Sequence, residues 1–167
     1  LALMLIFILI YLQFRVVSTS LLVFSGIFVA WSGGFMMIWL YNQGWFMDFT
    51  LLGIDFRELF QIKTINLSVA VWVGFLALFG IATDDGVIMA TYLQQKFKEN
   101  EPNTIQQIRE ATVEGAMKRV RPAMMTTVTT LLALIPVLTS TGRGSDVMVP
   151  MAIPSFGGMT VAILTVF

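Results

Sequence analysis

The chain has 167 residues, of which 57% are hydrophobic and only 12% are charged. A soluble domain carries about 25% charged residues, so the composition argues for an integral membrane protein. Ten Lys plus Arg balance ten Asp plus Glu, and without a basic excess the chain lacks the signature of a nucleic-acid binder. The sequence contains no Cys and no His, which excludes disulfides and thiolate or imidazole metal sites built from its own residues. We expect no bound cofactor.

Charge-free apolar runs predict an all-α, polytopic membrane helix bundle. A membrane-spanning helix needs about 20 mostly apolar residues. We place five transmembrane helices at about 1–14, 19–41, 65–94, 122–142 and 147–167. The sequence opens and closes in apolar residues, so we expect it to be a fragment of a longer protein.

Lys and Arg are distributed unevenly between the loops. Seven lie in the loops after the first and third spans, and Arg57, Lys63 and Arg143 lie in the loops after the second and fourth. Because cytoplasmic loops carry the excess of positive charge, we predict that the seven-charge side is cytoplasmic. Lipid is then the immediate surrounding of the bundle.

Two further helices are predicted between the spans. Residues 55–60 begin with Asp55 and carry Glu58 three positions later, a capping-box pattern. We interpret this segment as a short helix in the membrane interface, with a gate or a partner contact as the alternative. Residues 98–121 predict a cytoplasmic amphipathic connector helix, in which Glu114 and Lys118 are spaced to pair.

Two adjacent carboxyls inside the third span, Asp84 and Asp85, are the strongest functional signal. Each charged side chain costs about 2.5–3.5 kcal/mol at the centre of a membrane helix. Two close carboxyls also resist ionising together, so one of them can load and release a proton near neutral pH. That chemistry suits a proton-driven transporter. The alternative is that the pair lies in water near the cytoplasmic helix end, but Asp85 precedes Lys96 by about 16 Å of helix.

The fourth span offers hydroxyl groups as partners for these carboxyls. Thr126, Thr127 and Thr130 are the candidates, and interhelical packing is the alternative role. Eleven Met residues suggest a soft metal such as Cu(I) or Ag(I), although Met is also a common filler of apolar cores.

Three sets of residues, in this order, resemble a known family. They are Gly80–Val87 around the two carboxyls, Lys118–Thr127 with its Arg-x-Arg-Pro sequence, and Thr141–Met148 followed by Pro154–Met159. Together they resemble the resistance-nodulation-division (RND) efflux pumps, and in detail the CusA-like heavy-metal branch.

The resemblance implies the last five of twelve spans of a trimeric exporter in the bacterial inner membrane. Such a homotrimer works with a periplasmic adaptor and an outer-membrane channel, and proton influx drives it to export metal ions; the resemblance to the copper and silver pumps implies Cu(I) or Ag(I) here. Asp84 matches the family's relay glutamate, and Met148 matches a methionine of its stepwise copper path. Ala123 stands where the family has a relay lysine, so we expect Asp85 or a residue outside this chain to replace it.

Two other functions remain open. An RND relative that exports organic compounds or lipids would share the same motifs. A membrane-embedded assembly subunit without transport would retain its role when Asp84 is changed to Asn. An intramembrane enzyme is disfavoured, because the sequence has neither His nor Cys.

Overall fold

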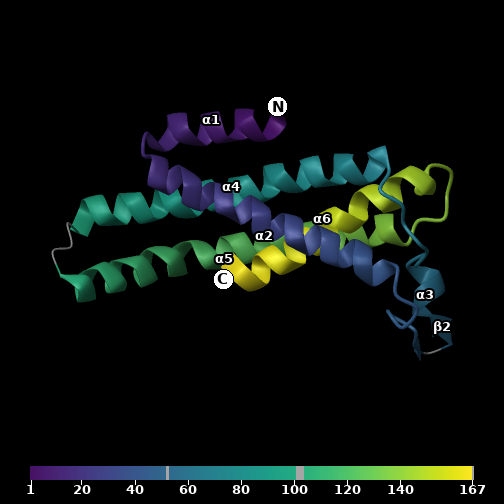
Figure 1. Cartoon of the computed structure of the whole chain (residues 1–167). Helices are drawn as coiled ribbons and strands as arrows, with labels where there is room; N and C mark the ends of the chain where they lie inside the picture. Colours follow the sequence, from purple (N-terminus) through teal and green to yellow (C-terminus); the bar gives the residue numbers. More distant parts are fainter. Residues whose placement is uncertain (52, 101–103, 167) are drawn as a thin grey trace.

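The protein, for which a computed structural model describes residues 1–51, 53–100 and 104–166, is a bundle of long helices (Figure 1). The long elements are α1 (Ala2–Phe14), α2 (Val17–Tyr41), α4 (Val69–Asn100), α5 (Ile105–Leu138) and α6 (Ser145–Val166). A short helix α3 (Phe56–Leu59) follows a two-stranded antiparallel hairpin of β1 (Thr50–Leu51) and β2 (Ile54–Asp55). The predicted all-α membrane bundle is confirmed.

Four helices of the described chain are long and apolar enough to cross a membrane: α2, α4, α5 and α6. The first predicted span, residues 1–14, corresponds to α1. With 13 residues it is about 20 Å long, less than the roughly 30 Å of a bilayer core. It lies beside α2, where the rings of Phe7 and Phe24 meet edge to face at 5.4 Å.

The predicted connector 98–121 and the predicted span 122–142 are not separate in the structure. Residues 98–100 end α4, and one continuous helix of 34 residues, α5, carries the rest through Pro122. The change from charged to apolar sequence marks a change of surroundings. It does not interrupt the backbone hydrogen bonds of the helix, from which Pro122 removes only one. Residues 101–103 of the connector and Phe167 of the last span lie outside the described residues.

Helix α6 packs closely against α2 and α4 through glycine contacts. A Cβ atom on Gly158 would lie 2.2 Å from a Leu78 side-chain carbon and 2.8 Å from the Ala30 carbonyl oxygen. A Cβ atom on Gly74 would lie 2.1 Å from the Met151 carbonyl oxygen. The buried Ser155 hydroxyl donates a 2.9 Å hydrogen bond to the Gly74 carbonyl across the same interface. Small residues thus hold the backbones together, as membrane helices require.

The two ends of the bundle correspond to the two predicted sides. Figure 1 shows the α1–α2 turn and the facing ends of α4 and α5 at one end, and α3 with the α5–α6 loop at the other. At the first end Lys96 Nζ lies 3.1 Å from Glu114 Oε1, and the predicted pair of Glu114 with Lys118 forms at 3.5 Å. The Lys96–Glu114 contact joins α4 to α5 where the two helices project beyond the α1–α2 turn (Figure 1).

The short helix predicted at residues 55–60 is present as α3 (Phe56–Leu59). The Asp55 carboxylate accepts a 2.9 Å hydrogen bond from the Arg57 backbone N–H and caps the helix start, which fits the Asp preference at this position. The hairpin before it was not predicted. Its turn contains Gly53 with φ of +82°, a conformation that glycine adopts without strain.

Candidate functional site

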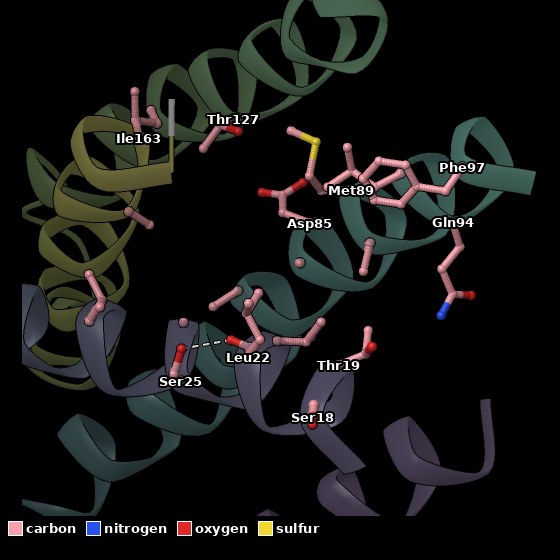
Figure 2. A pocket seen from close by; sticks show the side chains of 18 residues that line it. Ser18, Thr19, Leu22, Ser25, Asp85, Met89, Gln94, Phe97, Thr127 and Ile163 are labelled. Atoms are coloured by element: carbon pink, nitrogen blue, oxygen red, sulfur yellow. Dashed lines mark hydrogen bonds between the residues drawn. The ribbon is translucent and has the colours of Figure 1, made fainter. Parts of the chain in front are cut away.

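Asp84 and Asp85 lie in the middle of α4 and face different surroundings. Adjacent residues of an α-helix point about 100° apart, because the helix has 3.6 residues per turn. Asp84 is exposed on the surface of the described chain, whereas Asp85 is half-buried and lines a cavity. Figure 2 shows the Asp85 carboxyl near Met89, on the side toward Thr127 of α5. The structure therefore assigns the two carboxyls to separate environments.

The cavity beside Asp85 has a volume of about 640 Å³ and lies mainly between α2 and α4. Thr127 of α5 and Ile163 of α6 also contribute to its wall. Its lining is mostly apolar with a few hydroxyl and amide groups, the composition typical of small-molecule sites. The polar side chains that line it are Ser18, Thr19, Ser25, Asp85, Gln94 and Thr127.

Glycine contributes space to this cavity. A Cβ atom added to Gly26 of α2 would meet nothing within 4 Å, and one on Gly86 of α4 would come within 3.1 Å of a Val23 methyl carbon. Gly86 therefore packs against Val23, while Gly26 borders open space.

The three candidate threonines donate their hydroxyl protons within α5. Thr126 and Thr127 donate to the Ala123 carbonyl oxygen at 2.9 and 2.7 Å, and Thr130 donates to that of Thr126 at 2.8 Å. No hydrogen bond connects them to either carboxyl in the described chain. Each hydroxyl oxygen still has a free acceptor site for a protonated carboxyl. Of the three, Thr127 is buried and shares the cavity with Asp85, while Thr126 is exposed and Thr130 is half-buried.

Ala123, where the resemblance implies a lysine, contributes a buried methyl group. Ala123 is 3% exposed, and Arg119 precedes it by one helical turn on the same face of α5. The Arg119 guanidinium lies 6.0 Å from the ring centre of Tyr92 on α4. The Arg119 Nε is buried and has no hydrogen-bond partner among the described residues.

The sequence reading missed Arg119 as a candidate site residue. Its spacing of four from Ala123 is the signal that was available. A cation therefore lies one helical turn before Ala123, beside α4.

Met148 lies in the first turn of α6, with its side chain 47% exposed. Cu(I) and Ag(I) favour soft thioether sulfur, so this side chain has suitable donor chemistry. Among the described residues, no group of three or more His, Cys, Asp or Glu could hold a metal ion. His, Cys and carboxylate groups of the described residues therefore do not form a metal site together with Met148.

The family model and the relatives that match this chain all indicate the same family of efflux proteins. The model of the AcrB/AcrD/AcrF family matches residues 59–167. The chain is 40% identical to the cation efflux system protein CusA of Escherichia coli (strain K12), over 99% of this chain and 14% of that protein. It is 30% identical to the cobalt-zinc-cadmium resistance protein CzcA of Cupriavidus metallidurans, over 95% of this chain and 12% of that protein.

A third relative covers less of the chain. The nickel-cobalt-cadmium resistance protein NccA of Alcaligenes xylosoxydans xylosoxydans is 34% identical over 64% of this chain and 10% of that protein. The chain therefore spans 14% or less of the length of these relatives.

Proposed function

The chain belongs to the AcrB/AcrD/AcrF family, in the heavy-metal RND branch that its motifs resemble. From this membership we propose that the chain forms part of a proton-driven exporter of metal cations. Its family and its four apolar helices make it a multi-pass protein of the inner membrane. We propose that these helices carry proton translocation, while the rest of the exporter supplies the main path of the metal.

The separate placement of Asp84 and Asp85 on α4 carries this proposal. Asp84 is the main proton carrier and presents its carboxyl on the exposed face of the described chain, where further segments of the exporter can reach it. Asp85 exchanges protons through the cavity and tunes Asp84, because two neighbouring carboxyls resist ionising together. Thr127 accepts a hydrogen bond from the protonated Asp85, and Thr126 and Thr130 are the further hydroxyls of the relay.

Arg119 takes over the counter-charge role of the absent lysine. It lies on α5 beside Tyr92 of α4 and keeps a buried Nε–H free for a partner. When a carboxyl releases its proton, a nearby cation stabilises the charge that remains. Proton loading therefore changes the attraction between α4 and α5, and this change connects protonation to helix movement.

The transported ion is Cu(I) or Ag(I), with Met148 as one step of its path. This choice rests on the soft-donor chemistry of Met, of which the chain has eleven, and on the higher identity to CusA than to CzcA. The whole exporter works as a homotrimer with a periplasmic adaptor and an outer-membrane channel, as in the family that it resembles. Export of organic compounds or lipids remains the alternative substrate class.

The test uses the full-length parent protein in a metal-sensitive bacterial host. Wild type, Asp84→Asn, Asp85→Asn and the control Glu110→Gln, an exposed acid of α5, are titrated with Cu, Ag, Zn and Co at equal membrane abundance. We expect wild type and Glu110→Gln to give copper and silver resistance, Asp84→Asn to lose it and Asp85→Asn to retain part of it.

Each other outcome has a defined meaning. Unchanged resistance in Asp84→Asn and in the double Asn variant would remove proton carriage from this helix. Resistance to zinc and cobalt alone would contradict the copper and silver assignment. A wild type without any metal resistance would favour the organic substrates.

A further inference from the structure

An open polar pocket of about 740 Å³ lies between α3 and the loop that joins α5 to α6. Figure 1 shows these two segments at the same end of the bundle. The Gln61 side-chain amide donates a hydrogen bond to the Ser140 carbonyl and ties the two walls together. The proton and metal proposal above uses none of the residues that line this pocket.

The pocket presents charges of both signs. Its cations are Arg57, Lys63 and Arg143, and its carboxylates are Asp55, Glu58 and Asp146. No ion pair joins any of these six to each other, since the ion pairs of the described chain all lie at the opposite end. Arg57 donates to the Gly44 carbonyl oxygen and Asp55 caps α3, so Lys63, Arg143, Glu58 and Asp146, all exposed, are the charges that can bind a ligand carrying both signs.

A buried hydroxyl and a helix start reinforce the positive part of the pocket. Ser145 is 8% exposed, lines the pocket and forms no hydrogen bond through its hydroxyl within the described residues. It begins the 22-residue helix α6, whose N-terminal N–H groups attract negative charge. Arg143 lies two residues earlier, so cation, hydroxyl and helix start are next to one another.

Aromatic residues place the pocket at the depth of the lipid headgroups. Trp45 is 65% and Phe49 is 51% exposed, and the Phe49 ring stacks on Phe56 of α3 with ring centres 4.7 Å apart. Exposed Trp and Phe beside polar groups are typical of the membrane–water interface. The spanning helix α2 ends at Tyr41, four residues before Trp45.

We propose that this pocket binds the headgroup of a phospholipid that carries both a phosphate and a primary ammonium group, as phosphatidylethanolamine does. Arg143 and Lys63 bind the phosphate, and the Ser145 hydroxyl donates to one of its oxygens. Asp146 and Glu58 accept hydrogen bonds from the ammonium. A soluble phosphate would satisfy only the cations and would leave three carboxylates against its negative charge, so the charge pattern favours the lipid.

The experiment uses the full-length protein in lipid nanodiscs with a phosphatidylethanolamine probe that carries a photoreactive group in its acyl chain. We expect cross-links in peptides from residues 44–63 and 140–148. Unlabelled phosphatidylethanolamine should compete with the probe about five-fold better than phosphatidylglycerol, which has no ammonium, since a charge contact at the membrane surface is worth about that factor. Phosphatidylcholine, whose quaternary ammonium has no N–H, should also compete poorly.

Variants separate the two parts of the headgroup. Lys63→Ala with Arg143→Ala should lower the labelling by every phospholipid at least five-fold. Asp146→Asn with Glu58→Gln should retain the labelling and lose the preference over phosphatidylglycerol. Arg109→Ala, which removes an exposed cation of α5 at the other end, is the matched control and should change neither.

Three results would overturn the proposal. Equal competition by the three lipids for the wild-type protein would exclude recognition of the headgroup, whatever the variants show. Competition by inorganic phosphate would identify a soluble-anion site. Absence of cross-links from these peptides would mean that another segment of the longer protein occupies the pocket.

Discussion

Helices α2, α4 and α6 pack against each other in two different ways along their length. In the half near α3, the contacts are so close that a Cβ atom on Gly74 or Gly158 would overlap a neighbour. In the other half the same helices surround the cavity of about 640 Å³ that Asp85 enters. One half therefore fixes the helices relative to each other, and the other half leaves room for a titrating group and for solvent or small ligands.

Glycine has opposite roles in the two halves. At Gly74 the missing side chain permits backbone contact with Met151, whereas at Gly26 it borders empty space. The comparison shows that a small residue in a membrane helix can either close an interface or open a cavity. Substitutions at these glycines should therefore differ in sign.

The largest effect is expected for Gly74→Ala. Its Cβ would lie 2.1 Å from the Met151 carbonyl oxygen, and backbone on both sides cannot move without separating α4 from α6. We expect a loss of stability of roughly 3 kcal/mol, the upper part of the range for overpacked cores, measured as thermal unfolding of the purified full-length protein.

The matched control for this substitution is Gly80→Ala on the same helix. A Cβ there meets nothing within 4 Å, so the better helix propensity of Ala should leave the stability unchanged or raise it by up to about 1 kcal/mol. Equal losses in both variants would contradict the proposed difference between the halves.

A middle-sized effect is expected for Gly26→Leu, which places an apolar side chain in the cavity. The protein should fold and gain about 1 kcal/mol from helix propensity. Access to Asp85 should fall, which labelling with a hydrophobic carbodiimide measures, since this reagent modifies protonated carboxyls. Labelling of Asp84, on another face of α4, is the internal control. If both carboxyls lose labelling equally, the cavity is not the route to Asp85.

The smallest effect is expected from single hydroxyl groups. Ser155→Ala removes the buried bond to the Gly74 carbonyl and should cost about 1 kcal/mol. Ser25→Ala in the cavity half removes a hydroxyl that is exposed and donates only to Leu22 of its own helix, so thermal unfolding should not change. A larger loss at Ser25 would reverse the assignment of tight and open halves.

The sequence predicted the helices better than their junctions. The predicted spans 19–41 and 65–94 lie within or close to α2 and α4. In lipid, an apolar run of this length can satisfy its backbone hydrogen bonds by forming a helix. The boundary at Pro122 was different, since a drop in charge marks the membrane surface and carries no information about the backbone. The hairpin at residues 50–55 was missed because two short strands leave almost no pattern.

The sequence predicted which residues belong to the candidate site, but not how they are arranged in space. The spacing of Asp84 and Asp85 requires that they point in different directions, and this holds in the structure. Which of them faces the cavity depends on how α2 and α4 meet, which is a tertiary property. The three threonine hydroxyls donate to carbonyl oxygens of their own helix, as hydroxyls in helices readily do. Their oxygens can still accept a proton, so the predicted bonds to the carboxyls stay a prediction.

The unbroken helix α5 behaves as a lever. Its 34 residues extend about 51 Å, well beyond the roughly 30 Å of the bilayer core. Thr127, at the cavity, is about 33 Å along the helix from Ile105, so a tilt of about 10° around Thr127 swings the far end through about 6 Å. The Lys96–Glu114 contact links the end of α4 to this part of α5. A small tilt inside the membrane would thereby become a larger displacement at the projecting ends of α4 and α5.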